Sequence, residues 1–222
     1  MRRLYHLPLS PFSRKVRIIL GEKGLDATLI PEKVWERRPE FLALNPAGAV
    51  PVLIDLDGTV VVDSQVIAEY LEEVYPDRRL LGFDPAARAE TRRLAVWFDT
   101  LFQTEVTAHL LYEKVNKRFM GGGEPDSAKV RAGHQNIHRH MTYITWLVER
   151  RKWLGGEEYG LADITAAAHL SCLDYINAVP WEAHEPARDW YARVKSRPAF
   201  RAILADHIAG MPPPRHYADL DF

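Results

Sequence analysis

The pattern of hydrophobic and polar positions changes character near residue 84. Before that point, short apolar runs at 4–7 and 26–33 and a hairpin pattern at 50–64 alternate with an amphipathic stretch at 10–24. Alternating runs indicate strands, and apolar positions three to four residues apart indicate helices. After residue 84, strand signals nearly vanish and long helical patterns remain. The chain is therefore predicted to be an α/β part, a mixed sheet with helical cover, followed by an all-α part.

These signals divide the chain into four segments. We expect a small α/β domain at 1–76, a linker at 77–86, an all-helical domain at 87–210 and a tail at 211–222. The tail contains three consecutive prolines, which lack the N–H that a helix needs. It is therefore predicted to be extended.

Capping residues predict where the helices of the first domain begin and end. Ser10 is a good N-cap, Pro11 suits the first turn, and Gly24 is a typical stop. Ser64 is expected to cap the next long helix, and Asp57-Gly58 to form the hairpin turn before it.

Composition excludes several classes of protein. The 222 residues are 47% apolar, and 29 Lys and Arg nearly balance 30 Asp and Glu, which is unlike the basic surface of a nucleic-acid binder. The single cysteine, Cys172, cannot form an internal disulfide, which suits a reducing compartment. No signal peptide or apolar run of membrane-spanning length is evident. We therefore expect a cytoplasmic protein that neither binds nucleic acid nor inserts into a membrane.

Two serines offer candidate chemistry at the start of the first helix. Free N–H groups and the helix dipole stabilise an anion there, and the hydroxyl of Ser10 or Ser13 could hold a bound thiolate. The alternative is that Ser10 only caps the helix. Because no cysteine stands at either position, redox chemistry is not expected. Asp63 and Ser64 pose the same choice at the next helix, between a carboxylate site and an ordinary cap.

A pair of histidines raises the question of a metal. His134 and His138 stand four residues apart on one helix face, as two metal ligands would. No HExxH pattern or cysteine cluster accompanies them. We therefore expect a solvated or interface helix face and no metal site.

Four motifs in order resemble the cytosolic glutathione transferase superfamily. They are SPFSRKVRIILGEKG, NPAGAVPVLID, DSQVIAEYL and GLADITAAAHL, and the likeness spans nearly the whole chain. The resemblance implies a glutathione transferase fold with a thioredoxin-like N-terminal domain, a helical C-terminal domain and a homodimer. It also implies a cis peptide bond before Pro51 and glutathione held by Val50, Pro51, Asp63 and Ser64. In such a site, Ser10 or Ser13 would face the glutathione sulfur.

Two positions depart from that family pattern. Gly160 stands where the family usually has a Ser or Thr cap, although Asp163 follows as the family has it. Asp63 stands where the family more often has Glu, so its reach is shorter. We expect no required cofactor, and glutathione either as a ligand or as a co-substrate.

A second resemblance is closer and includes the tail. HYADLDF, ARDWYARVKSRPAFR and LDYINAVPWE look like the FtsZ-binding, glutathione-transferase-like division proteins of alphaproteobacteria. This implies a non-catalytic adaptor that binds FtsZ, affects filament curvature and links the ring to septal wall synthesis at the division site. The partner-binding tail residues would be His216, Tyr217, Asp219, Leu220, Asp221 and Phe222.

The sequence leaves two alternatives open. The tail either stands off the body and anchors in a partner, so that deleting 217–222 barely affects folding, or it packs along its own helical domain. The function is either the FtsZ adaptor or a glutathione S-transferase that conjugates glutathione to a small electrophile.

Overall fold

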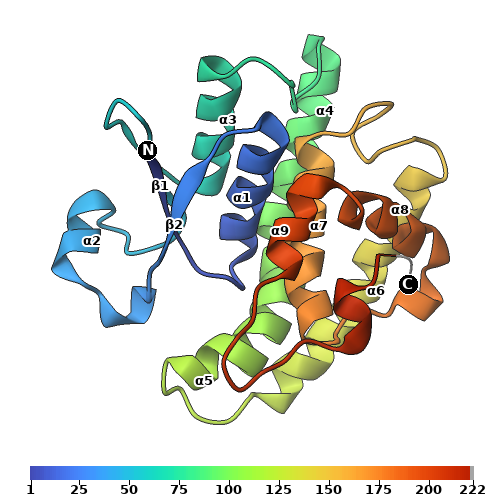
Figure 1. The fold of residues 1–222 in the computed structure, drawn as a ribbon. Helices are drawn as coiled ribbons and strands as arrows, with labels where there is room; N and C mark the ends of the chain where they lie inside the picture. Colours follow the sequence, from blue (N-terminus) through green and yellow to red (C-terminus); the bar gives the residue numbers. More distant parts are fainter. Residues whose placement is uncertain (221–222) are drawn as a thin grey trace.

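The structure is a computed structural model that describes residues 1–220. Figure 1 shows the α/β domain beside a larger helical domain, with α1 of the first packed against α7 and α9 of the second. Among the described residues, no helix combines the length and the apolar character that crossing a membrane requires. An α/β domain followed by a helical domain is the arrangement that the sequence predicts.

The elements follow the predicted order. The strands are β1 Arg2–His6, β2 Ala27–Pro31, β3 Val52–Ile54 and β4 Val60–Val62. The helices of the first domain are α1 Pro11–Lys23, η1 Val34–Glu36, α2 Pro39–Leu44 and α3 Ser64–Val74. Those that follow are α4 Pro85–Val96, η2 Trp97–Asn116, α5 Lys117–Phe119, α6 Ser127–Val148, α7 Leu161–Tyr175, η3 Trp181–Ala183, α8 Glu185–Lys195, α9 Pro198–Leu204 and η4 Arg215–Ala218.

The sheet is mixed, as predicted, with strand order β2-β1-β3-β4. β1 pairs in parallel with β2, because α1 connects them as a crossover, and antiparallel with β3. β3 and β4 form the predicted hairpin, in which Leu53 lies opposite Val61. The chain leaves β1 at its C-terminal end to enter α1, so the residues after His6 lie at that end of the central strand β1.

Caps define the helices of the first domain. Ser10 is the N-cap of α1, and Gly24 ends that helix in the left-handed conformation, as predicted. The prediction that Ser64 caps α3 is wrong. Asp63 is the cap, and its carboxylate accepts from the backbone N–H groups of Gln65 and Val66. Ser64 is instead the first helical residue and is buried.

The helical domain is built around α7. Every residue of α7 is buried, which agrees with its unusually apolar sequence. Gly160 caps it without a side chain, and Leu161 N–H donates to the carbonyl of Leu80 at 2.8 Å. A Cβ at Gly160 would lie only 2.4 Å from that same carbonyl oxygen. The close approach of the linker therefore explains why this chain lacks the Ser or Thr cap.

Of the described tail residues 211–220, the prolines at 212–214 lie in no helix, as predicted, but the expectation of a tail extended throughout is wrong. Residues 215–218 form the short helix η4, and the segment packs back on the helical domain (Figure 1). Tyr217 is completely buried, and Leu220 packs against the core. Burial of a large aromatic ring outweighs the tendency of the prolines to hold the segment away from the body. The tail residues Asp221 and Phe222 lie outside the described residues.

Candidate functional site

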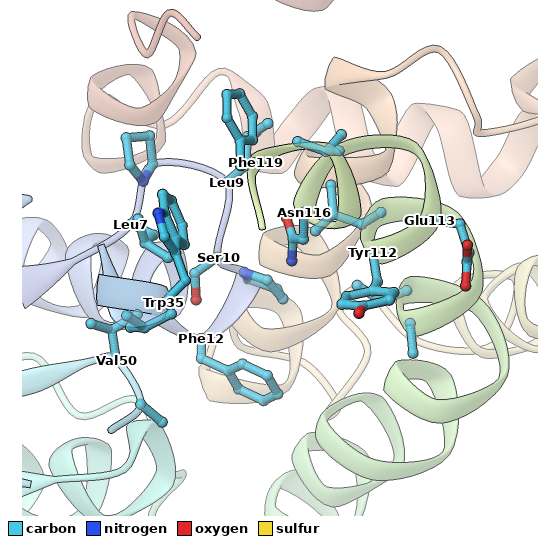
Figure 2. A pocket seen from close by; sticks show the side chains of 18 of the residues that line it. Leu7, Leu9, Ser10, Phe12, Trp35, Val50, Tyr112, Glu113, Asn116 and Phe119 are labelled. Atoms are coloured by element: carbon cyan, nitrogen blue, oxygen red, sulfur yellow. The ribbon is translucent and has the colours of Figure 1, made fainter. Parts of the chain in front are cut away.

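A cavity of about 810 Å³ lies between the two domains. Figure 2 shows side chains from the loop after β1 on one side of it and side chains from η2 on the other. η2 has the wide turns of a π-helix, a form often associated with functional sites. The lining of the cavity is largely apolar and includes Leu7, Leu9, Phe12, Val34, Trp35, Leu111, Tyr112, Val115, Phe119 and Ile208.

The two candidate serines occupy different places. Ser10 lines the cavity, and its Oγ accepts from the backbone N–H of Ser13 at 3.2 Å. Its hydroxyl hydrogen can still be donated to an anion in the cavity. Ser13 is fully buried, and its Oγ accepts from the N–H of Leu7 at 3.3 Å. Of the two, Ser10 is therefore the residue that could face a thiolate.

Val50 also lines the cavity, next to the peptide bond that the family resemblance singled out. The Val50–Pro51 bond is cis, as that resemblance implied. Pro51 itself is buried immediately before β3 and does not line the cavity. Residues 48–50, which precede it, form part of the cavity wall. Figure 2 shows Val50 on the same side of the cavity as Leu7 and Trp35.

The other two predicted glutathione residues do not line this cavity. Asp63 is exposed, but its Oδ1 already accepts from two N–H groups at the start of α3. Ser64 is only 3% exposed. The adjacent Gln65 is bonded to Lys15 and Glu69. A ligand carboxylate at this helix end would therefore compete with the carboxylate of Asp63 for the same donors.

An aromatic pair spans the cavity from one domain to the other. The rings of Trp35 in η1 and Phe119 in α5 stack with centroids 6.3 Å apart. Both residues line the cavity. Neither residue was predicted from the sequence, because nothing in the local pattern around a short loop and a short helix indicates that the two rings meet.

A buried polar chain runs beneath the cavity and joins the two domains. Lys15 in α1 donates to Asp99 at 2.6 Å, Asp99 contacts His169 at 3.3 Å, and His169 contacts Thr107 at 3.0 Å. Burial lowers the pKa of His169, so the ring is neutral. Burial would raise the pKa of Asp99, but His169 and Lys15 outweigh it and hold the carboxyl ionised.

These charge states determine which group donates in each hydrogen bond between Thr107, His169 and Asp99. Nε2 of His169 donates to the Asp99 carboxylate, so Nδ1 accepts from the Thr107 hydroxyl. Thr107 lines the cavity but is only 2% exposed. The arrangement resembles a Thr-His-Asp set, although Lys15 neutralises the aspartate and the hydroxyl is buried. We interpret it as a polar connection across the domain boundary.

The remaining candidates lie elsewhere. Burial raises the pKa of the Cys172 thiol to about 11, so it stays protonated and inert. His138 pairs with His184 at 3.1 Å, and His134 contacts Lys114. Within residues 1–220, no three metal-ligating side chains gather at one point.

Family models match both halves of the chain. Residues 4–79 match the glutathione S-transferase N-terminal domain, and residues 113–198 match the glutathione S-transferase C-terminal domain. The two matches fall on the α/β domain and on the helical domain that the structure contains.

Individual proteins match over the full length. FtsZ-localized protein A of Caulobacter vibrioides is 47% identical over 224 residues, covering 100% of this chain and 98% of that protein. A solved structure of a glutathione S-transferase from Rhodospirillum rubrum F11 is 56% identical, with a TM-score of 0.98 and complete coverage of both chains. The structure of FzlA from C. crescentus is 47% identical, with a TM-score of 0.97 over 100% of this chain and 99% of that one. The chain therefore belongs to the glutathione S-transferase family, and its full-length similarity to FtsZ-localized protein A agrees with the closer resemblance of its motifs.

Proposed function

We propose that this protein is a non-catalytic adaptor that associates with FtsZ at the division site in the cytoplasm. The observation that carries this proposal is the 47% identity to FtsZ-localized protein A over the whole chain, tail region included. A relative named for its localisation with FtsZ makes the same partner the first to test. Effects on filament curvature and a link to septal wall synthesis are further parts of the proposal.

The site geometry supports an adaptor over an enzyme. Of the four predicted glutathione residues, only Val50 lines the cavity with Ser10, whereas Ser64 is buried and Asp63 caps its own helix. Catalysis by a bound thiolate requires that the whole peptide be held in one orientation. Asp63 and Ser64, which were expected to hold the peptide part of glutathione, do not line the cavity. A ligand bound there would therefore be oriented less firmly, which favours binding without turnover.

Co-sedimentation with FtsZ from the same organism tests the proposal. The purified protein is mixed with FtsZ assembled in GTP and centrifuged, and a parallel sample contains FtsZ with GDP. We expect pelleting only with the polymer, persisting across a range of salt concentrations. Absence of pelleting at low salt, where electrostatic association is strongest, would contradict the FtsZ proposal.

We further propose that the protein is a homodimer. Trp97, Tyr143 and Trp146 form a continuous aromatic face across η2 and α6, with centroid distances of 4.8 and 6.2 Å along the row. Trp146 is 47% exposed, and the neighbouring Val96 is 52% exposed. An exposed apolar patch of this kind is typical of a protein interface.

A second function, glutathione conjugation, is favoured by one observation. Ser10 stands in the cavity at the N-terminus of α1, where a thiolate would be stabilised. Turnover of glutathione with 1-chloro-2,4-dinitrobenzene tests it. Ser10→Asp keeps the cap acceptor but adds a negative charge and removes the donor. Conjugation by the wild type that falls at least tenfold in Ser10→Asp would support an enzyme, and no turnover above the uncatalysed rate would exclude this reaction.

A further inference from the structure

One buried hydroxyl connects the C-terminal tail with the wall of the cavity. Tyr175, the last residue of α7, accepts from the backbone N–H of Ile208 at 2.8 Å and donates to the carbonyl of Met211 at 2.8 Å. Ile208 lines the cavity, and Met211 begins the tail. The Tyr175 hydroxyl therefore bonds to both segments, beside the backbone hydrogen bond of 3.0 Å from the N–H of Met211 to the carbonyl of Ile208.

The cavity side of this connection is a stretch of irregular backbone. Residues 207–209 line the cavity, as does the loop after β1. They belong to no helix, and Ile208 and Met211 close a narrow turn through Gly210, whose φ is +75°. Such a segment owes its position to the contacts on either side of it, because it has no helical hydrogen bonds of its own.

The tail side is held by buried and charged contacts. Tyr217 packs edge-on against Tyr175 with ring centroids 5.1 Å apart, and its ring lies 5.9 Å from the Arg14 guanidinium. Nε2 of His216 lies 3.0 Å from the buried carboxylate of Asp174. The docked tail therefore packs against Tyr175, the same residue whose hydroxyl bonds to Ile208 in the cavity wall.

We propose that occupancy of the interdomain cavity controls the docking of the C-terminal tail, with Tyr175 as the coupling residue. A ligand that fills the cavity contacts Ile208 in the position that the Tyr175 hydroxyl and the docked tail maintain. It therefore binds the docked state better than the undocked state, and this difference is what shifts the equilibrium. Occupancy keeps the tail docked, and by linkage a partner that needs the undocked tail competes with the cavity ligand.

The test places an apolar group in the cavity at a known position. Ala108 lines the cavity, and the native thiol of Cys172 is buried and inert, so Ala108→Cys can be modified selectively with N-phenylmaleimide. The cavity of about 810 Å³ is much larger than one phenylsuccinimide group. The readout is hydrogen exchange of the tail amides of Tyr217 and Asp219, which donate to Pro214 and His216.

Modification at Ala108→Cys is expected to slow exchange of these tail amides at least fivefold relative to the unmodified variant. Tyr175→Phe in the same background keeps the ring but removes the shared hydroxyl, and it should reduce the effect to less than twofold. As a matched control, Tyr70→Phe removes a hydroxyl bonded to Asp55 in the other domain and should leave the fivefold effect intact.

A second control places the same label on the exposed Asp26→Cys, where no change in tail exchange is expected. The proposal is overturned if cavity modification leaves tail exchange within twofold or accelerates it. It is equally overturned if Tyr175→Phe preserves the full effect, because the coupling would then run through other contacts.

Discussion

At the scale of single residues, Gly160 is a helix N-cap at which glycine is preferred over serine, because a neighbouring segment leaves no space for a side chain. Replacing a glycine N-cap with serine ordinarily changes stability by only a few tenths of a kcal/mol. Here the new Cβ would meet the carbonyl oxygen of Leu80 at 2.4 Å, and that oxygen is fixed by its bond to Leu161. We expect Gly160→Ser to lower the free energy of unfolding by about 1–3 kcal/mol.

Urea unfolding of the wild type, Gly160→Ser and Gly160→Ala measures this effect. The alanine variant carries the same Cβ without a hydroxyl, so both substitutions should destabilise to a similar extent. A serine variant more stable than the wild type would show that the linker moves aside and that the cap dominates.

His216 makes the tail sensitive to pH. The hydrogen bond and charge of Asp174 raise the pKa of His216 above its usual value, against burial and the charge of Lys195. The folded state therefore binds the proton more tightly than the unfolded chain. This contribution to stability is complete below the unfolded pKa of about 6.5 and is lost as the pH rises through the higher folded value.

The expected result is a larger stability difference between the wild type and His216→Gln at pH 6 than at pH 8. Glutamine retains an N–H donor near Asp174 but does not titrate over this range. Urea unfolding at the two pH values gives the difference. An equal difference at both would mean that protonation of His216 is not coupled to folding.

At the scale of elements, the tail is a structural part of the helical domain. Tyr217 is fully buried against Tyr175 and near Arg14, and its hydroxyl donates to Ile203 at 3.3 Å. Removing a large buried aromatic side chain costs about 3–5 kcal/mol. We expect Tyr217→Ala to lower the free energy of unfolding by about 3 kcal/mol. Tyr217→Phe, which removes only one hydrogen bond, should lower it by about 1 kcal/mol.

Thermal and urea unfolding of the two variants test this expectation. The result should differ from that of a free tail, in which deleting 217–222 would barely affect folding. If Tyr217→Ala unfolds at the same urea concentration as the wild type, the tail is not docked in solution.

Local patterns predicted the elements whose causes are local. The caps of α1 at Ser10 and Gly24 and the β3–β4 hairpin depend on residues within a few positions of one another. Arg14 and Lys15, by contrast, are buried because their partners come from distant parts of the chain. A charged residue in a helix is normally expected to face solvent, so their burial carries no sequence signal.

The candidate site divides in the same way. Ser10 and Val50 were identified from motifs and line the cavity. The facing wall, including Thr107 on η2, could not be predicted, because it depends on how the helical domain docks on the sheet domain. The docking of Tyr217 was likewise a matter of tertiary contacts that the run of three prolines does not reveal.

At the scale of the whole molecule, ion pairs join the two domains along α1. Arg197 bonds Glu22 through two hydrogen bonds of 2.6 and 2.7 Å, and Arg17 pairs with Asp206 at 2.7 Å. Lys15 and Asp99 add a largely buried pair. Breaking a buried pair leaves an uncompensated charge, so these contacts hold the domains in one arrangement. The loop after β1 and η2, which line the cavity from the two domains, are consequently held in a fixed relative position.

The aromatic face of Trp97, Tyr143 and Trp146 leads to the last prediction, which concerns assembly. If this face pairs with a second copy, light scattering gives about twice the chain mass of 25.4 kDa. Trp146→Asp places a charge at the exposed end of the row, where its desolvation in an interface is unfavourable. We expect this variant to be a monomer.

Phe83→Asp is the matched control for the assembly prediction. Phe83 is 66% exposed in the linker, so the same change in chemistry occurs away from the aromatic face. It should leave the mass at the dimer value. A wild-type protein that scatters as a monomer at every accessible concentration would contradict the homodimer. Dissociation by Phe83→Asp but not by Trp146→Asp would place the interface on another surface, because the charge that disrupts an interface must lie within it.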